Sequence, residues 1–153
     1  MAGWTNRGKY DVMRQAFQGN ASPSGFYVAL VTSASVPGAS KNVITDLVEV
    51  ASGNGYSTGG ASVTRGSAGF DVMTEDDAAS RAYARIIDVV WTAAGGELPA
   101  ASGGGARYAV LLDANVSPSL RAVYAYWDLS SSRQVSDGQT LTLQDLELRL
   151  DEA

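Results

Sequence analysis

The chain has 153 residues, no cysteine, no histidine and a formal net charge of −5. This length fits a single domain with a buried apolar core, and the lack of cysteine excludes disulfide bonds and thiolate metal sites. The lack of histidine removes the usual general base and the commonest metal ligand. An acidic chain with 11 scattered basic residues also lacks the clustered positive charge that binds nucleic acid or anionic membranes. We therefore predict a protein that is not an enzyme, uses no cofactor or metal ion, and binds neither nucleic acid nor membrane.

The sequence has no apolar run of about 20 residues, the length needed to span a membrane. Its first residues, MAGWTNRGKYDVM, lack the apolar core of a secretory signal. We therefore expect a soluble protein that is made in a cytoplasm.

Residues 1–20 differ in pattern from the rest of the chain. Thr5 is a typical N-cap residue, and Gly19-Asn20 is a typical helix stop. Between them, apolar residues recur at spacings of three and four, at Tyr10, Met13, Ala16 and Phe17. We predict a short amphipathic helix here, in an N-terminal helix or arm that precedes a single β domain over residues 21–153.

Short runs rich in aromatic and β-branched residues, separated by turns, predict the strands of the β domain. Residues 26–32, FYVALVT, are apolar on both faces and predict a central strand, and residues 42–47 predict a helical turn. Glycine-rich residues 93–106 predict a flexible loop. Further strands are expected over residues 61–64, 69–73, 81–91, 107–113, 122–129 and 139–150. About seven or eight short strands with one leading helix favour a mainly β fold, an antiparallel sandwich or barrel-like domain.

Two of the predicted strands have specific side-chain patterns. Alternation in residues 81–91 predicts one continuous strand with Ile87, Val89 and Trp91 on the same face. Residues 139–150 contain five leucines, Leu141, Leu143, Leu146, Leu148 and Leu150. The first two have the opposite parity to the last three, so a β-bulge near Gln144-Asp145 would bring all five inside. We predict that bulge.

Residues 53–60, GNGYSTGG, place four glycines around Tyr56 and suggest a loop that binds phosphate. A dinucleotide-binding loop needs the spacing GxGxxG, but Thr58 occupies the third glycine position and no long helix follows. We therefore interpret the segment as a glycine-rich turn between strands, in which Tyr56 packs as a plug.

Two other groups of side chains could form a site. Glu75-Asp76-Asp77 could bind a divalent cation, but the spacing of a calcium loop is missing and a solvated acidic turn is favoured. Aromatic residues on the predicted strands could stack on a sugar, although such rings more often lie in cores or interfaces. These residues are Tyr83, Trp91, Tyr108, Tyr124, Tyr126 and Trp127. Trp4 is a better candidate for an interface, because it precedes the helix near a free terminus.

Five blocks of sequence occur in a recognisable order within residues 26–150. They are FYVALVTSASVP, GNGYSTGG, IIDVVWTAAGG, ARYAVLL and VYAYWDL, and SDGQTLTL follows the last of them. In these blocks the chain resembles a family of small bacteriophage virion proteins, which are encoded among head and tail genes and described as structural. The helix WTNRGKYDVMRQAF and the acidic TEDDAASRA depart from the family pattern. The resemblance implies a non-enzymatic protein located in the virion, with other virion proteins as its partners.

Two functions follow from the resemblance and the residues. The first is a head decoration or cement subunit that self-associates, preferentially as a trimer, and binds the lattice of the major capsid protein, where many weak contacts give avidity. Its interaction residues are expected in the N-terminal segment, at Trp4, Tyr10, Met13 and Phe17. The second is a receptor- or carbohydrate-binding module of a tail fibre or baseplate, with Tyr56 and Trp127 as contacts. A third alternative, a glycosidase that uses the carboxylates of residues 75–77, has no sequence feature that places two carboxylates across a cleft.

Overall fold

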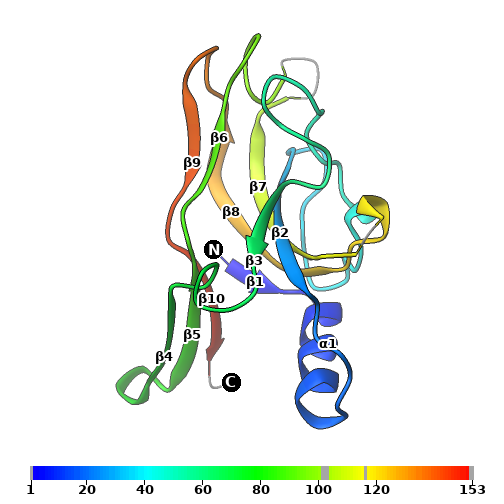
Figure 1. The fold of residues 1–153 in the computed structure, drawn as a ribbon, viewed down its shortest axis with the longest axis vertical. Coiled ribbons are helices and arrows are strands. Elements are labelled where there is room, and N and C mark those ends of the chain that lie inside the picture. Colours follow the sequence, from blue (N-terminus) through cyan, green and yellow to red (C-terminus); the bar gives the residue numbers. More distant parts are fainter. Residues whose placement is uncertain (1, 101–103, 116, 152–153) are drawn as a thin grey trace.

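The computed structural model describes residues 2–100, 104–115 and 117–151 (Figure 1). Its strands are β1 (Ala2–Trp4), β2 (Gly25–Val31), β3 (Ala61–Thr64), β4 (Val72–Asp76), β5 (Arg81–Ile86), β6 (Val89–Thr92), β7 (Ala106–Asp113), β8 (Val123–Arg133), β9 (Thr140–Leu143) and β10 (Leu146–Asp151). The helix α1 spans Asn6–Phe17, and single turns of 3-10 helix lie at η1 (Ile44–Asp46), η2 (Asp77–Ala79) and η4 (Pro118–Leu120). The predicted mainly β fold with one N-terminal helix is confirmed, with more strands than expected.

The strands form two layers, and every strand pair of the described residues is antiparallel. The first layer is a five-stranded sheet with the order β1-β8-β7-β2-β3. The second layer consists of the pair β6-β9 and the three-stranded sheet β10-β5-β4. Figure 1 shows the second layer standing along one side of the first. The arrangement is a sandwich and not a closed barrel.

The five-stranded sheet is covered on both faces, which explains its continuous apolar runs. In β2, Val28 and Leu30 belong to the core shared with the second layer. Ala29 lies on the opposite face, in a second cluster with Ile44 of the helical turn η1 and with Leu47, the residue that follows this turn. A strand buried on both faces needs apolar residues at successive positions, as FYVALV and YAVLL provide. The predicted central strand and helical turn are therefore confirmed.

Residues 81–91 form two strands instead of the single strand predicted. Strand β5 ends at Ile86 in the three-stranded sheet, and β6 begins at Val89 in the pair with β9. Because the connection resets the alternation, Ile86 is buried together with Val89 and Trp91, whereas Ile87 is exposed. The predicted face of Ile87, Val89 and Trp91 is therefore wrong.

Residues 139–150 also form two strands, β9 and β10, in different sheets. Asp145 between them has a φ of 53°, in the left-handed region, and this turn replaces the predicted β-bulge. The alternation of side chains between the two faces shifts by one residue at the predicted position, so four of the five leucines are buried. Leu150 is 56% exposed, so the prediction that it lies inside is wrong.

The predicted flexible loop over residues 93–106 contains a core residue. Leu98 is fully buried and forms an antiparallel bridge with Val135, whose N–H donates to the Leu98 carbonyl at 2.8 Å. Burial of one large apolar side chain therefore fixes this part of the glycine-rich segment, which corrects the prediction. Residues 101–103 of the predicted loop lie outside the described residues.

Candidate interaction surface

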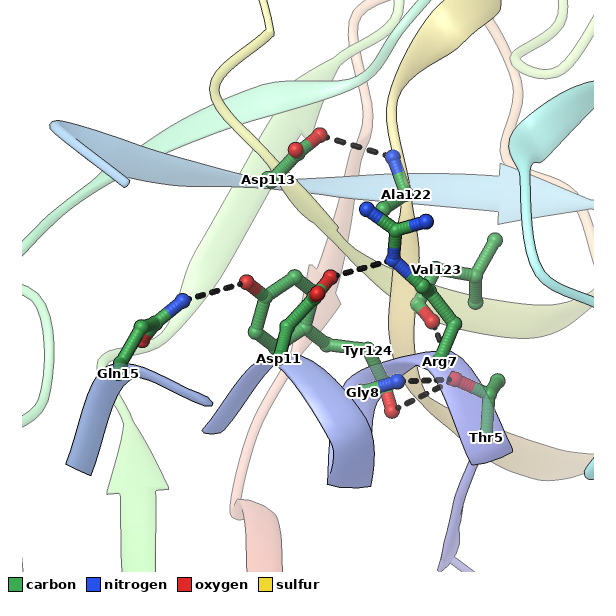
Figure 2. Close-up of polar contacts among 9 residues, drawn as sticks. All are labelled: Thr5, Arg7, Gly8, Asp11, Gln15, Asp113, Ala122, Val123 and Tyr124. Atoms are coloured by element: carbon green, nitrogen blue, oxygen red, sulfur yellow. Dashed lines mark hydrogen bonds and ion pairs between the residues drawn. The ribbon is translucent and has the colours of Figure 1, made fainter. Parts of the chain in front are cut away.

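Helix α1 begins at the predicted N-cap. The Oγ1 atom of Thr5 accepts a hydrogen bond from the Gly8 N–H at 2.9 Å and donates to the Val123 carbonyl of β8 (Figure 2). The Thr5 N–H also donates to the Tyr124 carbonyl, at 3.0 Å. Thr5 is fully buried. One residue therefore both begins the helix and fastens it to the five-stranded sheet.

Gly8 sets how closely the helix approaches β8. A Cβ atom at Gly8 would lie 2.2 Å from the Tyr124 carbonyl oxygen, far inside van der Waals contact. Any side chain at this position would therefore push α1 away from the strand. Glycine lowers helix propensity by roughly 1 kcal/mol relative to alanine, so its presence inside a helix reflects this packing requirement.

The face of α1 that lies on the sheet is largely polar. Asp11 is buried and forms an ion pair with Arg7, and this bond raises the pKa of the Arg7 guanidinium. Gln15 donates a hydrogen bond from Nε2 to the Tyr124 hydroxyl at 3.0 Å, as Figure 2 shows. Burial raises the pKa of Tyr124, which therefore remains a neutral hydroxyl. Gly8, Asp11 and Gln15 make this face more polar than that of an ordinary surface helix, and Val12 is an apolar side chain of α1 that packs against the core.

The apolar face of α1 points away from the domain. Tyr10 is 53% exposed, Met13 is 58% exposed and Phe17 is 83% exposed. Their spacing places them on one side of the helix, and the guanidinium of Arg14 lies 5.2 Å from the centre of the Tyr10 ring. The predicted amphipathic helix is therefore present, with its apolar side chains outside. We refer to Tyr10, Met13 and Phe17 as the outer helix face.

The segment before α1 belongs to the sheet and is not a free arm. Strand β1 pairs with β8 in a register that aligns Ala2 with Trp127 and Trp4 with Ala125. The indole N–H of Trp4 donates to the Arg149 carbonyl of β10 at 2.7 Å. Trp4 is therefore partly buried and joins the two layers. The predicted arm is anchored at its start and presents the outer helix face to solvent.

Tyr56 is buried, as its interpretation as a plug requires. Its hydroxyl accepts the Leu30 N–H at 3.0 Å and donates to the Glu49 carboxylate at 2.6 Å. Burial and the adjacent Glu49 carboxylate raise the pKa of Tyr56 well above its ordinary value. The ring is therefore not presented to a ligand, which corrects the expectation that Tyr56 forms a surface contact.

The glycines of GNGYSTGG serve close backbone packing. Gly55 and Gly60 have φ values of 96° and 81°, and a Cβ at either would lie 2.0 Å from a carbonyl oxygen of a neighbouring segment. The Gly59 N–H, which a phosphate would need, donates instead to the Glu49 carboxylate at 2.6 Å. The segment is a turn between strands, as predicted.

Trp127 is also buried, and its indole N–H donates to the Glu147 carbonyl of β10 at 2.9 Å. Like Tyr56, it offers no exposed ring, so the expected contact at Trp127 is also corrected. Of the six predicted interaction residues, the structure brings Tyr10, Met13 and Phe17 together on one exposed surface. Their helical spacing was the sequence signal for this surface.

The acidic residues 75–77 lie at the tip of the β4–β5 hairpin. Asp76 accepts the Ala79 N–H at 3.2 Å and forms an ion pair with Arg81 at 3.1 Å. Glu75 and Asp77 are exposed. Within the described residues, no group of three or more histidine, cysteine, aspartate or glutamate side chains could hold a metal ion. The described part of the chain also contains no helix long and apolar enough to cross a membrane.

Comparisons with protein-family models, with curated protein sequences and with solved structures found no match to this chain.

Proposed function

We propose that this protein is a non-enzymatic structural subunit of a bacteriophage virion, a decoration or cement subunit that self-associates as a trimer and binds the lattice of the major capsid protein. The outer helix face carries the proposal. Leaving a Phe, Tyr or Met side chain in water forgoes about 1.5–3 kcal/mol of burial energy for each, so such a group of side chains marks a protein contact.

The way α1 is held supports a role in assembly. Thr5 and Gly8 fix the helix against β8, so the outer helix face is already in place before a partner arrives. A preorganised surface loses little conformational entropy on binding. In a symmetric lattice, a small contact of this kind is repeated many times and gains strength by avidity. The sequence resemblance supplies the virion context.

Quantitative mass spectrometry of density-purified virions tests the location. We expect the chain in intact particles at a fixed ratio to the major capsid protein, in a copy number typical of a lattice component. A copy number of only a few per particle would contradict the decoration role and favour a tail component. Absence of the chain from purified particles would contradict the proposal altogether.

Binding to particles that lack the gene for this chain tests the surface. Purified wild-type protein is expected to bind such particles, whereas Phe17→Asp is expected to lose binding by at least about tenfold, because it places a charge where an apolar contact forms. Leu120→Asp is the matched control, since Leu120 is an exposed apolar residue of η4, outside α1. Equal binding by Phe17→Asp and Leu120→Asp would exclude the outer helix face from the contact.

A further inference from the structure

A second apolar surface lies at the same end of the molecule as α1. Figure 1 shows α1 and the β4–β5 hairpin extending beyond the five-stranded sheet at this end, on opposite sides. A groove of about 620 Å³ lies where the hairpin and β10 meet β1 and β2. Its apolar lining includes Phe26, Phe70, Met73, Tyr83, Leu148 and Leu150. We call this surface the hairpin groove.

The hairpin groove has an aromatic base and an exposed apolar rim. The rings of Phe26 and Phe70 meet edge to face with centres 5.5 Å apart. At the rim, Met73 is 78% exposed and Leu150 is 56% exposed. An apolar groove whose rim side chains remain in water has the features of a binding site.

We propose that the hairpin groove binds the outer helix face of a second copy of this chain. This inference rests on the proposed self-association and names the two surfaces that would form it. In helix-in-groove recognition, an amphipathic helix places anchors spaced i, i+3 and i+7 into an apolar groove. Tyr10, Met13 and Phe17 have this spacing. The groove volume lies in the range of roughly 300–1,000 Å³ that is typical of pockets for drug-sized ligands.

The charges of the helix and of the hairpin tip favour a second copy as the occupant. The helix carries three basic residues and one acidic residue in a chain whose net charge is −5. Arg7 pairs with Asp11, whereas Lys9 and Arg14 form no ion pair within the described residues.

The opposite charge lies at the hairpin tip, next to the groove, where Glu75 pairs in register with the groove residue Ala82. The exposed carboxylates of Glu75 and Asp77 lie at the hairpin tip and likewise form no ion pair in the described part of the chain. One cation, Arg65, also lines the groove and lies in the turn after β3, not on the hairpin. A basic helix beside an acidic hairpin tip favours the docked orientation and speeds encounter.

The proposed contact joins two different surfaces of the same chain. Each copy uses its outer helix face on one neighbour and its hairpin groove on another, which is a heterologous contact. Such contacts continue until the rotation between copies closes a ring. A closed ring of three copies fills every groove and covers every helix, which agrees with the proposed trimer.

Complementation between two assembly-defective variants tests the contact. The helix variant is Phe17→Asp, and the groove variant combines Met73→Lys with Leu150→Lys. All three positions are exposed, so both variants are expected to fold, as circular dichroism can verify. In sedimentation experiments, we expect wild-type protein and the control Leu120→Asp to form the same closed oligomer. Each assembly variant alone is expected to be monomeric.

An equal mixture of the two variants gives the decisive result. The helix variant retains an intact groove and the groove variant retains an intact helix, so the mixture is expected to form a heterodimer that cannot grow further. A mixture that remains monomeric would overturn the proposal. A groove variant that still assembles like wild type would overturn it as well and would indicate helix-to-helix pairing.

These outcomes are separable from those of the proposed function. Absence of the chain from virions would contradict the virion role and leave the complementation result intact. Presence in virions, with normal assembly of the groove variant, would contradict only the groove assignment. A wild-type chain that stays monomeric at high concentration would overturn both the groove contact and the proposed trimer.

Discussion

Apolar side chains are buried in the middle of the five-stranded sheet, whereas several are exposed at the end of the molecule that carries α1. Leu30 in β2 and Leu111 in β7 are buried, because the chain covers both faces of this sheet itself. At the other end, Tyr10, Phe17 and Met73 remain exposed. The first region has all the neighbours it needs within one chain. In the second region, apolar side chains remain in contact with solvent.

The contact between α1 and β8 explains why the helix has this orientation. Gly8 brings the helix backbone against β8, so little room remains between them for large side chains. The side chains that bridge the contact are polar: the Thr5 hydroxyl donates to the Val123 carbonyl, and the Gln15 amide donates to the Tyr124 hydroxyl. Because Gly8, Asp11 and Gln15 take the inner side, Tyr10, Met13 and Phe17 lie on the opposite side of the helix and face outward.

The largest effect is expected at the centre of the sheet. Leu30→Ala should lower the free energy of unfolding by about 2–5 kcal/mol, because it removes a fully buried side chain and leaves a cavity. Urea denaturation followed by circular dichroism measures this change. A loss below about 1 kcal/mol would mean that the sheet relaxes around the cavity and that the two regions differ less than the burial indicates.

An intermediate effect with an unusual sign is expected at the helix contact. In most helices, replacing glycine by alanine stabilises by roughly 1 kcal/mol. Gly8→Ala should instead destabilise by about 1–3 kcal/mol, because the new methyl group overlaps the Tyr124 carbonyl. The neighbouring exposed position supplies the control, since Lys9→Ala should change the unfolding free energy by less than about 0.5 kcal/mol. Stabilisation by Gly8→Ala would show that α1 does not lie this close to β8.

The smallest effect on stability is expected on the outer helix face. At a concentration where the protein is monomeric, Phe17→Ser should change the unfolding free energy by no more than about 0.5 kcal/mol, because the ring is 83% exposed. The same variant should weaken self-association in sedimentation experiments. A stability loss similar to that of Leu30→Ala would place the ring inside its own chain and remove the contrast between the two regions.

Much of the fold could be predicted because each strand carries its own local pattern. The apolar residues on both faces of β2 and the aromatic residues of β8 predict buried strands, whichever strands they pair with. The chain passes from one sheet to another at Ile87-Asp88 and again at Asp145, and these two crossings could not be predicted from local pattern. Neither break contains glycine or proline, and the sheet that a strand joins depends on partners far away in sequence.

The candidate surface was predictable in its residues and not in its direction. Spacing alone identifies Tyr10, Met13 and Phe17 as one side of a helix. Whether that side faces the core depends on what the opposite side of the helix contacts. Here the opposite side contacts β8, a strand far away in the sequence. A glycine and an aspartate three residues apart, Gly8 and Asp11, are the local signal that the polar side faces inward. The surface contacts expected at Tyr56 and Trp127 are wrong, because aromatic type does not distinguish a buried ring from an exposed one. The interpretation of Tyr56 as a buried plug is confirmed.

Trp4 and Trp127 lie at the junction of the two layers, so tryptophan fluorescence can report on this junction. The chain has three tryptophans. Two of them donate indole N–H groups to carbonyls of β10, and the third, Trp91, lies 6.0 Å from the Tyr56 ring, measured between ring centres. Intrinsic fluorescence therefore reports chiefly on the space between the layers. Its emission would shift when the layers separate, even while the hydrogen-bonded backbone of the five-stranded sheet stayed intact.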